Sequence, residues 1–436
     1  MSTKKILIRA GKDPRVPMTA YETFSTNPIG NNNGNLIFAT AAHKLLSASE
    51  QQVDVHGLAF HPRHAARVNE EYDHVVLPLA NAFRRGFEAQ LKNLTLFVEK
   101  LNIPVTMLSG GAQSGPDGSF DNLLPMKSTA QRFCAAVLER SPKLTVRGER
   151  TAEYLRSIGV RDVEVIGCPS VTLNGRGHRV DVDFSRAVKK VAYNVETSKD
   201  LAGSLVESVE ANCDAHYFAQ DMKTFELMLH GTEAFPHGRD GRLPLRSSHS
   251  QFTAGKARFP LDAWTWIEEL RGYDFAFGPR IHGNVTSVLA GTPALLFAHD
   301  SRTRELAEYH GIPHLTESQY QNVSSLDDLL EKVDYSEFNA RHGDNFDRLI
   351  SFVHESGLST IYDEGEERAL ESYRRSVDAV TFPPSLTTTW ADQPEFVRHR
   401  FAHERELELE LKRLRASMSE MKAEVKRLKE NVAAAV

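Results

Sequence analysis

The stretch YDFAFGPRIHGNVTSVLAGTPALLFAHDSRTRELAEYHGIPHL, from Tyr273 to Leu315, decides the expected fold. Its pattern predicts a strand, a tight loop, a helix, a second strand, a loop and a second helix. Strands separated by helices are typical of βαβ crossovers and a parallel sheet. Both loops then leave the carboxyl edge of that sheet, where open α/β proteins bind their ligands.

Charged side chains gather on these two loops. Arg280 and His282 follow the first strand, while His299, Asp300 and Arg302 follow the second. Guanidinium groups beside an imidazole indicate an anionic substrate and a catalyst of proton transfer. The spacing fits an ordinary βαβ unit equally well, in which the same residues only cap helices and contact solvent.

The alternation of strands and helices covers most of the chain and breaks once. The expected strands are 4–10, 73–79, 104–110, 143–148, 162–168, 189–195, 215–221, 273–279 and 292–298, and the expected helices of the first half are 36–48, 87–101, 128–139 and 149–158. The polar stretch 172–186 separates the two series. We therefore expect an α/β fold with two Rossmann-like domains, 1–176 and 187–378, that face a cleft; a single large sheet would show the same periodicity.

The end of the chain follows a different pattern. Prolines and threonines at 379–395 indicate a linker, and residues 396–434 indicate a coiled-coil helix. Glu410 and Arg415 flank this repeat at positions that meet in a parallel pair, as do Glu424 and Lys429, so the pattern favours a parallel homodimer. A single amphipathic helix packed on its own domain is the alternative. The heptad seam has Leu411, Met418, Val425 and Val432 at position a and Leu407, Leu414, Met421 and Leu428 at position d.

Length and composition indicate a soluble protein with more than one domain. The chain has 436 residues, of which 41% are hydrophobic and 25% charged. Its net charge of −6 gives no overall basic field for nucleic acid. No apolar run approaches the roughly 20 residues that span a bilayer, and the apolar part of the start is too short for a secretory signal. We therefore expect a cytoplasmic protein without a membrane span.

Three strings in the sequence resemble the polysaccharide pyruvyl transferase family. They are GPRIHGNVTSVLAGTPALLF (278–297) with HDSRTREL (299–306), LTVRGERTAEYLRSIGVRDVEVIGCPSVTLN (144–174) and, more weakly, PIGNNNGNLIFATAAHKLL (28–46). Enzymes of that family move the enolpyruvyl unit of phosphoenolpyruvate onto a sugar, usually as a cyclic ketal. The resemblance also implies a two-domain architecture similar to that of the B-type glycosyltransferases.

Three arginines are candidates for binding phosphoenolpyruvate. Its carboxylate and phosphate require donors that keep their charge, and guanidinium groups bind such oxyanions through two parallel hydrogen bonds. Arg147, Arg280 and Arg302 follow expected strands. By the resemblance, Arg147, His282 and Arg302 fall on the family's phosphoenolpyruvate contacts. Arg302 replaces a usual lysine and Cys168 a usual aspartate, so these two positions depart from the family's pattern.

The chemistry also requires proton transfer. Ketal formation protonates the methylene carbon of phosphoenolpyruvate and deprotonates sugar hydroxyls. A group with a pKa near neutrality serves in either direction, which makes His282 the expected acid. Asp300, with His299 as the weaker choice, is the expected second base.

Two glycine-rich turns, 27–35 and 109–115, are candidates for the acceptor side. Glycine lets the backbone approach a ligand closely, and a following helix offers N–H groups. Plain turns are the alternative, and neither turn has a nucleotide-binding motif. No metal site or organic cofactor is indicated. The candidate acceptor contacts are Gly34, Asn35, Gly110, Gly111 and Gln113.

The sequence thus predicts a ketal-forming pyruvyl transferase that uses phosphoenolpyruvate and a saccharide acceptor in the synthesis of a cell-surface polysaccharide or glycolipid. One alternative is a glycosyltransferase of the same fold, in which the arginines hold the diphosphate of a nucleotide sugar. Another is a catalytically silent scaffold whose functional part is the coiled coil.

Overall fold

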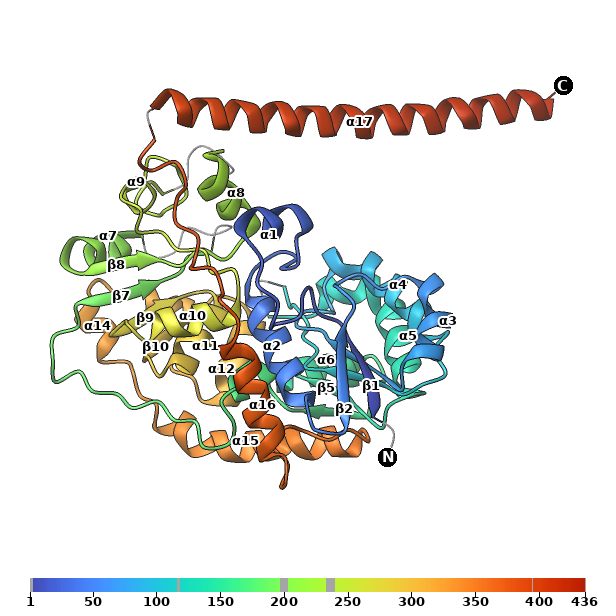
Figure 1. Ribbon diagram of the computed structural model, residues 1–436, viewed down its shortest axis with the longest axis horizontal. Helices are drawn as coiled ribbons and strands as arrows, with labels where there is room; N and C mark the ends of the chain where they lie inside the picture. Colours follow the sequence, from blue (N-terminus) through green and yellow to red (C-terminus); the bar gives the residue numbers. More distant parts are fainter. Residues whose placement is uncertain (1–2, 116–117, 197–202, 233–239, 394, 436) are drawn as a thin grey trace.

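The computed structural model describes residues 3–115, 118–196, 203–232, 240–393 and 395–435. In this part of the chain two α/β domains lie side by side, and one long helix extends away from them (Figure 1). The expected fold of two α/β domains with parallel sheets is therefore confirmed.

The first domain is built on a parallel sheet in the order β2-β1-β3-β4, which β5 and β6 continue through a bridge between Gly110 and Val146. Its strands are β1 (Lys4–Ile8), β2 (Gln51–Val55), β3 (His74–Pro78), β4 (Val105–Leu108), β5 (Leu144–Val146) and β6 (Val163–Val165). Its helices are α1 (Ala20–Thr26), α2 (Gly34–Leu46), α3 (Ala65–Glu71), α4 (Glu88–Val98), α5 (Lys127–Leu138) and α6 (Glu149–Ser157).

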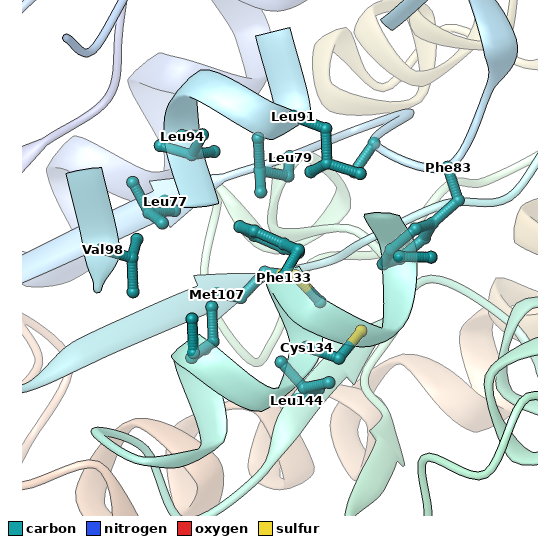
Figure 2. Close-up of a cluster of buried hydrophobic side chains, with 14 of the residues drawn as sticks. Leu77, Leu79, Phe83, Leu91, Leu94, Val98, Met107, Phe133, Cys134 and Leu144 are labelled. Carbon is teal, nitrogen blue, oxygen red and sulfur yellow. The ribbon is translucent and has the colours of Figure 1, made fainter. Parts of the chain in front are cut away.

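Apolar residues on alternate positions of these strands are buried on both faces of the sheet. On β1, Leu7 belongs to one core cluster while Ile6 and Ile8 belong to another. Figure 2 shows the cluster between the sheet, α4 and α5, where Phe133 packs near Met107. Burial on both faces is typical of parallel sheets. β2 was not expected from the sequence because, of its residues, only Val53 is buried.

The second domain repeats this plan with the order β11-β10-β9-β7-β8. Its strands are β7 (Lys190–Tyr193), β8 (Asp214–Tyr217), β9 (Phe275–Gly278), β10 (Ala294–Ala298) and β11 (His314–Thr316). Its helices are α7 (Gly203–Asn212), α8 (Met222–His230), α9 (Ser250–Thr253), α10 (Ala263–Leu270), α11 (Ile281–Ala290), α12 (Ser301–His310), α13 (Glu317–Tyr320) and α14 (Leu326–Leu330).

In both sheets the order in which strands are added switches sides at the same point. The second strand of each domain lies on one side of the first strand, and the third and fourth lie on the other. Such a switch point leaves a crevice at the carboxyl ends of the first and third strands, where doubly wound proteins bind ligands. The topology thus predicts one binding crevice in each domain.

Helices α15 (Ser336–Glu355) and α16 (Glu367–Asp378) follow the second domain in sequence. On α15, Leu349 and Phe352 pack in one core cluster with Ile6 and Ile8 of the first domain. The chain therefore returns to the first domain before residue 378, and the limits 1–176 and 187–378 remain predictions.

Helix α17 (Glu395–Ala435) carries the heptad seam. Near its start Arg405 pairs with Glu226 of α8 at 2.8 Å. The alternative that the seam packs on its own domain is wrong for six seam residues, which are 47–61% exposed. The side chains of Leu428, Lys429 and Val432 lie outside the described part of the structure. The six exposed seam residues are Leu407, Leu411, Leu414, Met418, Met421 and Val425.

Candidate active site

A cleft of about 680 Å³ lies between the two domains and is lined by loops at the carboxyl ends of both sheets. Arg9 follows β1 and Arg147 follows β5 on the first domain. Across from them, Glu196 lies just beyond β7, His282 beyond β9 and His299 directly after β10. The two crevices predicted by the topology thus form one site.

Arg280 and His282 lie at the start of α11 and not in the expected loop. Arg280 is the residue before the first turn, and its N–H donates to Asn194 Oδ1 at 2.6 Å. A Cβ atom on Gly283 would come within 2.4 Å of Gln220 Nε2, so this close approach requires glycine. Among the described residues no side chain caps α11, and its amino end lines the cleft.

The guanidinium of Arg280 is held by its own domain. Nη1 lies 3.4 Å from Glu196 and Nη2 lies 3.8 Å from Asp221, while Nε donates to the carbonyl of Val195 at 3.2 Å. Most of its positive charge is therefore matched before any ligand arrives. Arg280 also ties the loop after β7 to the start of α11.

His282 is buried, with 9% of its surface exposed. Burial, together with the positive charges of Arg147 and Arg302, lowers its pKa to about 3. Its Nε2 lies 4.0 Å from the thiol of Cys168. A Cβ on Gly34 would lie 2.7 Å from the Cβ of His282, so Gly34 leaves room for this side chain. The imidazole is thus neutral at neutral pH.

The structure gives Asp300 a different task from the expected base. Its carboxylate caps α12 by accepting from the N–H of Thr303 at 2.9 Å, and it forms an ion pair with Arg302. Burial raises the pKa of Asp300, but Arg302, His299 and the hydrogen bonds outweigh burial and hold this pKa well below its usual value. A carboxylate stabilised in this way is a weak base.

Arg147 is 2% exposed, and two of its three guanidinium nitrogens have no hydrogen-bond acceptor among the described residues. Its backbone N–H donates to the carbonyl of Gly110 at 3.0 Å, yet Nε and Nη2 find no acceptor among the described residues. A Cβ on Gly111 would lie 2.6 Å from the carbonyl oxygen of Ala80 and 3.0 Å from Arg147 Cδ. Glycine at this position therefore makes room for the arginine.

Two of the five predicted acceptor residues line the cleft. Asn35 and Gln113 reach it, whereas Gly34, Gly110 and Gly111 are not among its lining residues. Gly34 and Gly111 instead make room for His282 and Arg147. Each turn thus contributes one of its predicted acceptor residues to the cleft, and its role in binding an acceptor stays a prediction.

Several further residues of the cleft were missed. Arg9 is the next-to-last residue of an expected strand and Glu196 directly follows another, so the rule that ligands bind at carboxyl ends of strands could have identified both. Arg84 lies in the loop between β3 and α4, at the start of the short 3-10 helix η2 (Arg85–Phe87), and no pattern marks it. Asn81 and Gln220 also belong to the polar lining.

Two further features bear on the class of protein. In the described ranges, no group of three or more histidine, cysteine, aspartate or glutamate side chains is placed to hold a metal ion. No helix within the same ranges combines the length and apolar character needed to cross a membrane.

Comparison with protein families gives one match over most of the chain. Residues 11–301 match the family described as polysaccharide pyruvyl transferase. This range contains the cleft residues from Gly30 to His299 but ends just before Arg302. No curated protein matches the sequence.

Several solved structures are similar to the chain at low identity. The UDP-N-acetylglucosamine 2-epimerase from Rickettsia bellii has a TM-score of 0.44 and 12% identity, covering 81% of this chain and 96% of its own. The UDP-GlcNAc 2-epimerase of Methanocaldococcus jannaschii, in complex with UDP-GlcNAc and UDP, has a TM-score of 0.42 and 11% identity, with 80% and 99% covered. The glycosyltransferase SnogD from Streptomyces nogalater has a TM-score of 0.32 and 12% identity, covering 86% of this chain and 100% of its own. Scores below 0.5 support no statement about function.

Proposed function

Because the chain belongs to the polysaccharide pyruvyl transferase family, we propose that it transfers the pyruvyl group of phosphoenolpyruvate to two hydroxyls of a saccharide in the cytoplasm, for a cell-surface polysaccharide or glycolipid. The observation that carries this proposal is the state of Arg147. Its buried Nε and Nη2 lack acceptors at the cleft, and its charge acts on His282. An anion with several oxygen atoms would satisfy these donors.

The charges of the cleft suggest how phosphoenolpyruvate is oriented. Arg147, whose buried donors lack acceptors, and Arg302, whose charge acts on Arg147 from the second domain, suit the phosphate, which carries the larger negative charge. The amino end of α11 offers N–H groups and a positive dipole end, which suit the carboxylate. In this orientation the reacting carbons lie beside His282.

His282 then acts as the general acid. The negative charge of bound phosphoenolpyruvate counteracts Arg147 and Arg302 and raises the pKa of the imidazole, so substrate and proton bind together. The proton passes to the methylene carbon, and one sugar oxygen bonds to the central carbon. The bond from that carbon to the phosphate oxygen breaks, and the second sugar oxygen closes the ketal. Of the two hydroxyl protons, one replaces the proton of His282 and the other leaves with phosphate.

Glu196 is better placed than Asp300 to accept a hydroxyl proton. Its carboxylate lines the cleft, 3.4 Å from Arg280 and 3.9 Å from His299 Nε2. Asp300 is instead engaged as the cap of α12. Asn35 and Gln113, with Asn81, are proposed to contact the acceptor on the first domain.

The test is calorimetric titration of the purified protein with phosphoenolpyruvate and, separately, with UDP-glucose and UDP-GlcNAc. Release of phosphate is then followed after addition of methyl glycosides of galactose, glucose and mannose. We expect phosphoenolpyruvate to bind and phosphate release to depend on a saccharide. Binding of a UDP-sugar without binding of phosphoenolpyruvate would contradict the proposal in favour of a glycosyltransferase.

We further propose that α17 pairs with α17 of a second copy. An apolar seam that is half exposed is unfavourable in water, and an isolated helix gains little stability without a partner. In a parallel pair, Glu410 meets Arg415 and Glu424 meets Lys429. An antiparallel pair aligned over the whole seam would place Arg415 beside Lys422, which repel. The charges therefore favour the parallel arrangement.

Sedimentation of full-length protein tests this pairing. Replacing Leu414 and Met421 with Asp would bury charges in the seam, at a cost of several kcal/mol per charge. We expect this variant to sediment as a monomer and to bind phosphoenolpyruvate normally. Asp at the two outward positions 413 and 420 is the control and should remain dimeric. A Leu414→Asp/Met421→Asp variant that stays dimeric would place the interface elsewhere.

A further inference from the structure

Arg84 reaches the cleft from the first domain without a charged partner. It precedes η2 and lines the cleft wall opposite α12. Its Nε is buried and has no hydrogen-bond acceptor, and no carboxylate in the described ranges forms an ion pair with it. Its guanidinium carbon lies 5.8 Å from the centre of the Phe87 ring, which supports its position but does not match its charge.

Arg84 also belongs to a cluster of like charges. Burial lowers its pKa, and Arg302 of the opposite domain lowers it further. Arg302 acts in the same direction on Arg147, so it lies close enough to repel both. Three guanidinium groups thus converge on one region of the cleft, two from the first domain and one from the second.

The carboxylates near this cluster match only part of its charge. Asp300 pairs with Arg302. Glu305, near Arg147, accepts from the N–H of Thr151 at 2.9 Å and from its hydroxyl at 2.7 Å, so both of its oxygens are engaged. Arg84 and Arg147 are the two members whose buried donors lack acceptors. An anion from outside the chain would satisfy these donors and match the remaining charge.

We infer that Arg84 is the third arm of a phosphate site, reaching across the cleft to hold the phosphate group of phosphoenolpyruvate together with Arg147 and Arg302. This inference rests on the proposed function. A phosphate dianion offers three terminal oxygens, and each can accept from one guanidinium. Arg84 thereby makes donor binding depend on both domains, because the other domain supplies Arg302 and His282.

Titration calorimetry with three ligands tests the assignment. Phosphoenolpyruvate, inorganic phosphate and pyruvate are titrated into full-length wild type, Arg84→Gln, Arg84→Lys and the control Arg85→Gln. Arg85 is the exposed neighbour and does not line the cleft. Losing charge-assisted hydrogen bonds should weaken phosphoenolpyruvate and phosphate binding by roughly 10- to 100-fold in Arg84→Gln, whereas pyruvate binding should stay unchanged. The affinity of Arg84→Lys should lie between those of wild type and Arg84→Gln, because lysine keeps the charge but loses the paired hydrogen bonds of the guanidinium.

Thermal unfolding of the same proteins without ligand separates binding from folding. Removing Arg84 removes like-charge repulsion, so the midpoint of Arg84→Gln should equal or exceed that of wild type. A lower midpoint together with equal loss of all three ligands would assign Arg84 a structural role and overturn the inference. So would unchanged binding of phosphate and phosphoenolpyruvate in Arg84→Gln, or in Arg84→Lys if Arg84→Gln does not fold. If wild type binds phosphate but not phosphoenolpyruvate, the proposed function fails, and the effect of Arg84→Gln on phosphate binding still decides whether Arg84 is an anion ligand.

Discussion

Both sides of the cleft carry arginines, but among the described residues those of the second domain have carboxylate partners and two of those of the first domain do not. On the second domain, Arg280 lies 3.4 Å from Glu196, and Arg302 likewise has a carboxylate partner. On the first domain, Arg147 and Arg84 reach the cleft with buried donors that have no acceptor in the described part of the chain. The arginines of the second domain are thus charge-matched without a ligand, whereas Arg84 and Arg147 of the first domain are not.

This difference separates arginines that build a site from arginines that bind its ligand. A buried donor without an acceptor costs about 1–3 kcal/mol, and a ligand that satisfies it recovers that free energy on binding. A guanidinium already paired with a carboxylate, such as Arg280 or Arg302, gains less from a ligand anion than one without such a partner. We therefore expect the first domain to contribute more to anion affinity, although the sequence places two of the three expected arginines on the second.

The largest expected effect concerns His282, which lies between the two sides. His282→Ala should lower turnover by about 10²–10⁴-fold, because it removes the general acid. Phosphoenolpyruvate affinity should change much less. Steady-state phosphate release and calorimetry measure the two effects, with His354→Ala, at an exposed histidine, as the control. Near-normal turnover in His282→Ala would exclude it from the mechanism.

Next in size is a direct test of the two sides. Lysine keeps the charge of arginine but not its paired hydrogen bonds. Arg147→Lys should weaken phosphoenolpyruvate binding by roughly 10- to 100-fold, since its unmatched donors are lost. Arg280→Lys should weaken binding only about threefold, because its charge is already matched. Calorimetric affinities of the two variants decide the comparison, and a greater loss in Arg280→Lys would reverse it.

A smaller effect follows from the pKa of His282. In the unliganded site this pKa is lowered to about 3, and the bound anion should raise it. Between the unliganded and bound pKa values, binding must therefore take up a proton, and affinity must fall as pH rises. Calorimetry in Pipes and in Tris, whose ionisation enthalpies differ, measures this uptake. His282→Gln is the control for ionisation of the ligand itself, and equal uptake by this variant would contradict the mechanism.

The smallest expected effect concerns Asp300. Asp300→Ala should lower the free energy of unfolding by about 0.5–2 kcal/mol, because it removes the cap of α12. Turnover should fall by less than tenfold, since the proposed base is Glu196. Denaturant unfolding and phosphate release measure both quantities. A loss of turnover above 100-fold in folded protein would restore Asp300 as the base.

The sequence predicted the order of most strands and helices, whereas the roles of the acid–base residues remain predictions. Strand and helix patterns depend on neighbours within a few residues, so β9, α11 and β10 could be recognised directly. Arg147 and His282 were found because they follow strands or match a motif. The helix cap that Asp300 forms could not be told from a base by sequence, because both have the same residue type at the same place after a strand, and its role in catalysis stays a prediction. The structure confirms the helix predicted at the end of the chain, while the coiled coil and its partner remain a proposal.

By itself, the sequence determined the two α/β domains, the carboxyl ends of strands that carry the chemistry, and the apolar seam of α17. These properties follow from local periodicity and from the positions of charged residues after strands. Only the tertiary structure decided which arginines are matched by carboxylates and which are not. Glu196 and Arg280, or Arg84 and Arg302, are far apart in sequence and meet only when the sheets pack. Charge interactions depend on distance and burial, so the role of each arginine was set by the fold and not by its motif.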